Sequence, residues 1–310
     1  MTAQKDNGVL IVGSVALDSV ETPAGFVERA LGGAATYSSV SASFFAPVML
    51  VGIVGQDFPK EHIDFLKSRS IDIRGLEIAD GETFHWKGSY EGDMNQALTI
   101  ATELNVFQTF SPELPEDYKK VKYVFLANID PEIQLKVLDQ IEAPTLVACD
   151  TMNFWIETKR DALLEVIKRV NVVFINDAEA RQLMKTFNLN KAATAIRQLG
   201  PRYVIIKKGE HGAAMYCDQS TCFAAASYPL DEVVDPTGAG DSFAGGFMGF
   251  ISQQKDIDES SIRKAVVVGS TMASFNVQDF SLNMFKKINI EDINARYNEF
   301  RKMAHFDAMS

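Results

Sequence analysis

The chain has 310 residues, 46% of them hydrophobic and 23% charged, so it can bury a large core and is neither disordered nor fibrous in composition. Its formal net charge of −11 argues against a general nucleic-acid or anionic-membrane surface, although backbone amides and one lysine can still hold a phosphate. No apolar run approaches the length of a membrane span, and the polar start 2–8 lacks the features of a signal peptide. We therefore expect a cytoplasmic protein.

Short apolar runs alternate with amphipathic stretches along most of the chain. Runs that are apolar on both faces are typical of strands covered by helices on each side. They are Val9–Gly13, Val48–Val54, Lys122–Ala127, Thr145–Cys149, Val172–Ile175 and Tyr203–Lys207. Between them, apolar residues recur at helical spacing, which predicts a doubly wound, mostly parallel α/β sheet covered by helices on both faces. No repeat or interdomain linker is visible, so we expect one domain over residues 1–310.

Two regions interrupt this alternation, at about residues 15–31 and 76–102. Both are polar and contain glycines. Within the second, Phe84–Tyr90 alternates aromatic and polar side chains, as a half-exposed strand does. Because both insertions leave the main sheet, we expect them to combine into a small β-sheet lid.

The most informative stretch runs from Asp235 to Phe243. A short β-type run ends at Asp235, Pro236 fixes a turn, and the glycines of Gly238–Gly240 allow backbone geometry that side chains would block. The apolar residues that follow have helical spacing, which places the glycines at a helix N-terminus, where amides bind anions. Asp241, in the first turn, can accept the proton of an attacking hydroxyl during phosphoryl transfer.

The sequence disfavours two other nucleotide-binding classes. It contains no Walker-A pattern, so a P-loop kinase is not expected. The dinucleotide fingerprint Gly-x-Gly-x-x-Gly is missing too, since its third glycine position after Gly240 holds Phe243. A nicotinamide-dependent oxidoreductase is therefore disfavoured.

The stretch Asp235-Pro-Thr-Gly-Ala-Gly-Asp-Ser-Phe243, with Gly245 and Gly246, closely resembles the C-terminal signature of the ribokinase or PfkB carbohydrate kinase family. That family also includes nucleoside kinases. Further landmarks follow in the family's order over nearly the whole chain. They are the first sugar-contacting loop at Gly13–Asp18, the Gly-Gly substrate motif at Leu31–Thr36, the Asn-x-x-Glu motif at Asn176–Glu179 and the phosphate-side strand and turn at Lys207–Gly212.

The resemblance implies roles for individual residues, with ATP as phosphate donor and Mg²⁺ as metal. Asp241 would be the general base, and Gly238, Ala239 and Gly240 would form the anion hole. On the nucleotide side, Asn176 and Glu179 would hold Mg²⁺ largely through water, Lys207 would face the phosphates, and Gly209 and Thr237 would adjoin the nucleotide. On the acceptor side, Asp18, Gly32 and Gly33 would bind hydroxyls. Many relatives bind a monovalent cation such as K⁺ near the position of Asp235. Alternatively, Asn176–Glu179 only caps a helix and Asp18 is an ordinary turn aspartate.

The acceptor is the most open part of the prediction. Where ribokinase-like sugar kinases usually carry asparagine, this chain has Tyr37. Further aromatic residues crowd the same side of the predicted site, namely Phe84, Trp86, Tyr90, Phe154 and Trp155. Since a nucleobase stacks on such faces, we favour the 5′-hydroxyl of a ribonucleoside as acceptor, with Tyr37 and Trp86 among its contacts.

Two alternatives stay open. A free sugar such as ribose or fructose is the alternative acceptor, and a non-catalytic nucleotide- or sugar-binding regulator is the alternative function. The intact Asp241, Asn176 and Glu179 argue against a mere binder, which needs no base. Relatives often dimerise through their lid sheets, and the lid pattern here permits a homodimer.

Overall fold

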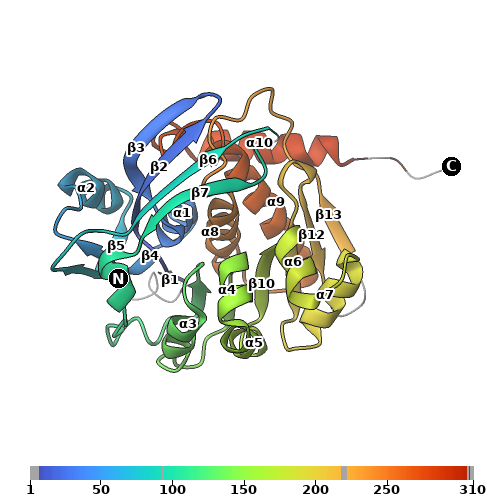
Figure 1. Ribbon diagram of the computed structural model, residues 1–310. Coiled ribbons are helices and arrows are strands. Elements are labelled where there is room, and N and C mark those ends of the chain that lie inside the picture. Colours follow the sequence, from blue (N-terminus) through green and yellow to red (C-terminus); the bar gives the residue numbers. More distant parts are fainter. Residues whose placement is uncertain (1–6, 93, 218–221, 306, 308–310) are drawn as a thin grey trace.

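The computed structural model of the protein describes residues 7–92, 94–217, 222–305 and 307. Within these residues the strands form two sheets, one of nine strands and one of four. Helices cover the larger sheet on both faces, and the smaller sheet lies across one end of the molecule, as Figure 1 shows. The predicted fold class is confirmed.

The nine-stranded sheet has the order β13-β12-β11-β10-β9-β8-β1-β4-β5. All neighbours from β11 to β5 are parallel, and β12 and β13 are antiparallel additions at one edge. The strands are β1 (Val9–Val12), β4 (Val48–Gly55), β5 (Ile71–Ala79), β8 (Tyr123–Leu126), β9 (Leu146–Cys149), β10 (Val172–Asn176), β11 (Tyr203–Lys207), β12 (Ala213–Tyr216) and β13 (Cys222–Ala225). Each of the six predicted apolar runs forms a strand of this sheet. The carboxyl ends of its parallel strands therefore meet along one edge.

Two apolar layers separate the sheet from its helices. On one face the buried core includes residues of α1 (Ala34–Ala42), α2 (Lys60–Ser68), α8 (Ala239–Ser252), α9 (Glu259–Asn276) and α10 (Ile290–Met303). The other face is covered by α3 (Pro131–Leu138), α4 (Asn153–Thr158), α5 (Arg160–Lys168), α6 (Asp177–Met184) and α7 (Leu189–Arg197). Strand residues contribute alternately to the two layers, which explains why their runs are apolar throughout. No helix in the described part of the chain is long and apolar enough to cross a bilayer.

The smaller sheet, hereafter the small sheet, has the order β3-β2-β6-β7. Its strands are β2 (Ala16–Thr22), β3 (Gly25–Gly32), β6 (His85–Tyr90) and β7 (Ala97–Glu103), so both polar insertions contribute to it. The second insertion starts later than the sequence pattern indicated. Leu76–Ala79 belong to β5, which pairs with β4 at the edge of the main sheet. An edge strand is exposed along one side, and this gives it the mixed pattern expected of a lid strand.

Helices α1 and α8 cross closely and bring the two halves of the chain together. A Cβ atom added at Gly245 would lie 2.1 Å from the Ser38 carbonyl oxygen, so only glycine fits at this crossing. The Ser38 hydroxyl donates to the Asp241 carbonyl oxygen at 3.1 Å, and the Ser41 hydroxyl donates to the Ser242 carbonyl oxygen at 2.6 Å. These bonds fix the first turn of α8, which carries Asp241, against α1.

Candidate active site

The signature loop forms a tight turn into α8. Gly238 is the N-cap residue and has φ +74°, a left-handed conformation that glycine adopts without steric cost. The Ala239 amide donates to the Pro236 carbonyl oxygen at 3.1 Å and the Ser242 amide to the Gly238 carbonyl oxygen at 2.8 Å, so the Gly240 amide between them is a donor that the first turn can offer to an anion. Asp241 lies in this first turn, as predicted. The loop therefore combines an anion-binding helix end with a carboxylate.

Two buried side chains hold the loop in place. The Asp235 carboxylate accepts hydrogen bonds from the Thr237 amide at 2.9 Å and from the Ser281 amide at 3.1 Å. Asn276 donates to the Thr237 carbonyl oxygen at 2.7 Å and accepts from the Ser242 hydroxyl at 3.0 Å. Sequence reasoning missed Asn276, since an asparagine near the end of α9 shows no local sign that it contacts a loop almost forty positions earlier.

Lys207 and Asp150 form an ion pair beside the loop. Lys207 ends β11 and Asp150 follows β9, and their Nζ and Oδ2 atoms are 2.5 Å apart. A Cβ atom added at Gly240 would lie 2.9 Å from Lys207 Nζ, so the lysine ammonium lies directly against the loop backbone. Burial lowers the pKa of Lys207, but the charges of Asp150 and Glu179 outweigh it and raise that pKa. Lys207 therefore stays protonated where the phosphates were predicted.

Asp241 belongs to the same charged cluster. Burial, together with the negative charge of Asp150, raises its pKa to about 7, although Lys207 acts in the opposite direction. A carboxyl group with a pKa near neutrality is suited to accept a proton at physiological pH. Asp150 was missed by sequence reasoning, yet a signal existed. It directly follows a buried parallel strand, at the sheet edge where Asn176 and Lys207 also lie.

Asn176 and Glu179 form a capping box at the start of α6. The Asn176 Oδ1 atom accepts from the Glu179 amide and Glu179 Oε2 accepts from the Asn176 amide, each at 2.8 Å. The capping role considered from sequence is thus present, and it leaves Glu179 Oε1 outside the box. Burial, together with the negative charge of Asp150, raises the pKa of Glu179 to about 7, although the charge of Lys207 acts in the opposite direction. Glu179 therefore shares its electrostatic surroundings with the cluster around Asp241.

Asp18 and the Gly-Gly motif form the acceptor side. The Gly33 amide donates to Asp18 Oδ2 at 3.3 Å, and a Cβ atom at Gly32 would lie 1.9 Å from the same oxygen. Burial, together with the charges of Asp235 and Asp241, raises the pKa of Asp18 to about 7, although the hydrogen bond from the Gly33 amide acts in the opposite direction. Asp18 therefore lies within electrostatic reach of the candidate base.

The Tyr37 ring packs directly against Gly238 of the signature loop. A Cβ atom at Gly238 would lie 2.3–2.5 Å from three atoms of the Tyr37 ring, and the side chain is 2% exposed. Its ring is therefore unavailable for stacking on a nucleobase, contrary to the prediction. The pKa of Tyr37 is raised by burial and by the charges of Asp18 and Asp235. Contact between its hydroxyl and an acceptor stays a prediction.

The aromatic residues of β6 have different surroundings. Trp86 pairs in register with Asp18, covers Gly88, and donates from Nε1 to the Thr99 hydroxyl at 3.3 Å. The Tyr90 hydroxyl lies 3.4 Å from the Thr237 hydroxyl, so the small sheet touches the signature loop.

The other aromatic residues considered from sequence are Phe84, Phe154 and Trp155. Phe84 stacks on Phe107 at 5.4 Å between ring centroids, in the apolar layer, and does not face the acceptor side. On α4, Trp155 donates from Nε1 to Asn128 at 3.0 Å, and Phe154 meets it edge-on.

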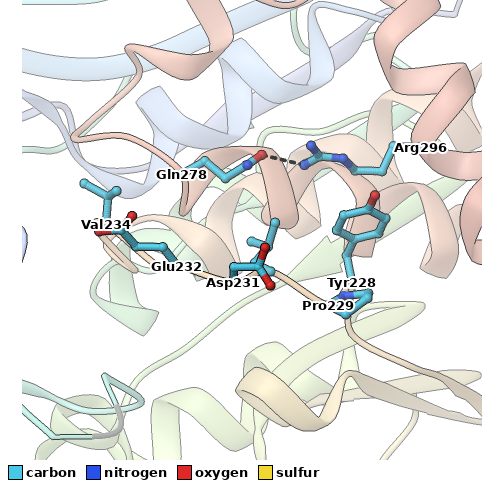
Figure 2. A pocket seen from close by; sticks show the side chains of 8 residues that line it. Tyr228, Pro229, Asp231, Glu232, Val234, Gln278 and Arg296 are labelled. Atoms are coloured by element: carbon cyan, nitrogen blue, oxygen red, sulfur yellow. Dashed lines mark hydrogen bonds between the residues drawn. The ribbon is translucent and has the colours of Figure 1, made fainter.

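A cavity of about 450 Å³ lies beyond the loop, between residues 228–234, the end of α9 and α10. Figure 2 shows the Arg296 guanidinium over the Tyr228 ring, with a hydrogen bond of 2.7 Å to Gln278 Oε1. Asp231 and Glu232 also line it, and none of the predicted site residues does. The cavity adjoins the signature loop through Val234 but is not the charged cluster.

The structure therefore brings most predicted residues together around the start of α8. Asp241, Gly240, Lys207 and Glu179 share one cluster with Asp150, and Asp18 with the Gly-Gly motif approaches it from the acceptor side. Gly209, at φ +53°, lies in the exposed turn after β11. In the described residues no three His, Cys, Asp or Glu side chains are arranged to hold a metal ion directly.

This chain is similar in sequence to a family of kinases and to individual nucleoside kinases. The pfkB family carbohydrate kinases match this chain over residues 9–285. A cytidine kinase of Thermococcus kodakarensis is 33% identical over 255 residues, which cover 81% of this chain and 91% of that protein.

Solved structures share the fold. A nucleoside kinase of Methanocaldococcus jannaschii, an archaeal member of the ribokinase family, superimposes with a TM-score of 0.76 at 22% identity, covering 95% of this chain and 99% of that one. A fructokinase double mutant of Vibrio cholerae O395, solved with fructose, ADP and potassium ion, gives 0.78 at 17% identity, covering 94% and 98%. The family match spans most of the chain and includes the cluster around Asp241, so the chain belongs to the pfkB family of carbohydrate kinases and is a phosphotransferase that acts on an alcohol group.

Proposed function

We propose that this protein transfers the γ-phosphate of ATP to the 5′-hydroxyl of a ribonucleoside. The observation that carries the proposal is the position of Asp241, in the first turn of α8, with Lys207 beside the preceding glycine and Asp18 within electrostatic reach. Phosphoryl transfer needs donors for the phosphate oxygens and a base for the attacking hydroxyl, and this arrangement supplies both.

The nucleotide side fits a triphosphate with Mg²⁺. Lys207 and the amides at the start of α8 would contact the phosphates. The Lys207 ammonium pairs with Asp150 and interacts electrostatically with Glu179 and Asp241, so a bound divalent cation would balance the charge of these carboxylates when they are ionised. Mg²⁺ usually keeps several waters, which agrees with Asn176 and Glu179 holding it through water. When bound, Mg²⁺ neutralises charge on the transferring phosphoryl group.

Proton transfer is the task of Asp241. Its raised pKa makes it a stronger base than an ordinary aspartate while it remains partly ionised near pH 7. Asp18 and the Gly33 amide would orient the acceptor hydroxyls so that the attacking oxygen lies against Asp241. The amides of the first turn of α8 would stabilise charge on the phosphoryl oxygens.

A nucleoside acceptor is supported by Trp86 and Tyr90 and by the similarity to a cytidine kinase. Trp86 lies beside Asp18 in register, so a ribose held by Asp18 would place its base near the indole. Stacking on an aromatic face favours a base by about 1–3 kcal/mol. The small sheet would then serve as the lid over the acceptor.

Three finer features complete the proposal. Asp235 would adjoin a K⁺ ion. A homodimer would form through the small sheet, where Phe26 and Leu98 lie in one cross-strand row and are 51% and 64% exposed. The reaction would take place in the cytoplasm.

The test is ADP release measured over a panel of nucleosides and free sugars. Adenosine, inosine and cytidine should exceed ribose and fructose in kcat/KM. If ribose or fructose is the better substrate, the acceptor assignment fails while the kinase assignment stands. ATP binding without turnover on any acceptor would instead favour the non-catalytic regulator.

A further inference from the structure

One hairpin of the small sheet spans the whole length of the candidate site. Strand β6 begins beside β2, where Trp86 pairs with Asp18 on the acceptor side. It ends at Tyr90, whose hydroxyl lies 3.4 Å from that of Thr237 in the signature loop. Asn95, just before β7, reaches the turn after β11, which was predicted to adjoin the nucleotide.

Asn95 makes this last contact. Its Nδ2 atom donates to Glu210 Oε1 at 3.4 Å. A Cβ atom added at Gly209 would lie 2.3 Å from Asn95 Oδ1, so the amide of Asn95 lies directly over the Gly209 backbone. Gly209 has φ +53° and forms the start of the exposed turn, with Gly212 at φ +77° as its end. The hairpin thus places an amide side chain at the glycine over which the nucleotide was expected to pass.

We propose that Asn95 is a further binding residue for the triphosphate of the nucleotide, contributed by the acceptor-side sheet. The proposal rests on the ATP site proposed above and extends it. Phosphate oxygens are strong acceptors, and a side-chain amide donates to them without adding charge. With ATP present, the Nδ2 donor of Asn95 would exchange Glu210 for a phosphate oxygen.

The electrostatics of the turn support this exchange. Glu210 is exposed and its hydrogen bond with Asn95 is long, so water competes with it and the contact is easily given up. A triphosphate carries more charge than a carboxylate and is a better acceptor for the same donor.

The experiment is a direct titration of the full-length protein with ATP and with AMP, both without acceptor. Asn95→Ala should weaken ATP binding by about tenfold, since a hydrogen bond to a charged group is lost, and Asn95→Asp should weaken it further. AMP binding should not change, because AMP lacks the β- and γ-phosphates. Gln96→Ala, at the neighbouring exposed position, is the matched control and should bind ATP like the wild type.

Glu210→Ala tests the alternative that the contact between Asn95 and Glu210 only holds the hairpin against the turn, with no contact between Asn95 and ATP. Glu210→Ala removes one hydrogen bond from Asn95 Nδ2 and one negative charge from the turn, so ATP binding should be unchanged or tighter. If Glu210→Ala weakens ATP binding as much as Asn95→Ala does, the contact only holds the hairpin against the turn and the proposal fails. Equal losses for ATP and AMP, or unchanged ATP binding in Asn95→Ala, would overturn it as well. These titrations need no acceptor, so they stand even if the nucleoside assignment fails.

Discussion

The ammonium of Lys207 lies 2.5 Å from the Asp150 carboxylate, and the same ammonium borders the position where a side chain at Gly240 would project. Asp150 therefore acts on the catalytic loop through the lysine. It also raises the pKa of Asp241 by its negative charge. A residue outside the family signature thus influences both the phosphate-binding cation and the base.

The first prediction concerns the base. Asp241→Asn should lower kcat by about a hundredfold or more, the usual scale for a lost general base, while ATP binding stays nearly intact. The measurement is kcat with saturating substrates, alongside a titration with ATP. Asp80→Asn, an exposed aspartate after β5, is the control. Turnover close to wild type in the Asp241→Asn variant would remove this residue from the chemistry.

A second prediction follows from the ion pair. Asp150→Asn removes a negative charge that raises the pKa of Asp241, and it also releases Lys207, which lowers that pKa. Losing the Asp150 charge and leaving Lys207 unpaired from it both lower the pKa of Asp241 and so favour its ionised form. The acidic limb of the kcat/KM profile, expected near pH 7 in the wild type, should therefore move to lower pH in the variant. A limb that stays in place, or moves upward, would show that Asp150 does not control the base.

The third prediction concerns stability and pH. Asp18, Glu179 and Asp241 have pKa values of about 7 in the native protein, against ordinary values of 3.8 and 4.5. Between these limits the native state binds more protons than the unfolded chain. The free energy of unfolding should therefore fall as pH rises from about 5 to 8. Thermal midpoints of the ligand-free protein would reveal this slope, and Asp18→Asn should flatten it. Equal slopes in variant and wild type would argue against the raised pKa.

A fourth prediction separates two glycines of the loop. Gly238→Ala forces a left-handed φ and a clash with the Tyr37 ring, so it should lower both stability and activity. Gly240→Ala meets only the flexible end of Lys207, so the fold should persist while the lysine is displaced and kcat falls. Denaturant unfolding and kcat, measured together, distinguish the two effects. Equal loss of stability in both variants would contradict the assigned contacts.

Much of the fold could be predicted because its signals are local. Each parallel strand is buried on both faces and is therefore an apolar run, as Val172–Ile175 illustrates. The sequence pattern does not predict two features at the edges of the main sheet. The end of β5 has the mixed pattern of an exposed strand and was grouped with the lid. Strands β12 (AAMY) and β13 (CFAA) are short antiparallel additions whose apolar runs consist largely of alanine, a residue that is depleted in strands.

The site was predictable only where its functional residues lie close together in the sequence. The loop around Asp241 combines glycines, a turn and a carboxylate within a few residues, so its chemistry is visible locally. Asp150 and Asn276 are single polar residues whose importance depends on strands and helices that meet only in the folded chain. Tyr37 shows the opposite error. An aromatic residue near the acceptor motif suggested stacking, but the close approach of Gly238 buries its ring.

The last prediction concerns the acceptor and uses two neighbours on β6. Trp86 pairs in register with Asp18, whereas His85 points to the opposite face, where its Nε2 lies 3.0 Å from the Ser19 hydroxyl. Trp86→Ala should therefore lower kcat/KM for a nucleoside by roughly ten- to a hundredfold, which is the loss of about 1–3 kcal/mol of base stacking, and should change ribose use little. His85→Ala should affect both substrates much less. A similar loss for nucleoside and ribose in Trp86→Ala would mean that the indole only supports the small sheet, and the free-sugar assignment would then be favoured.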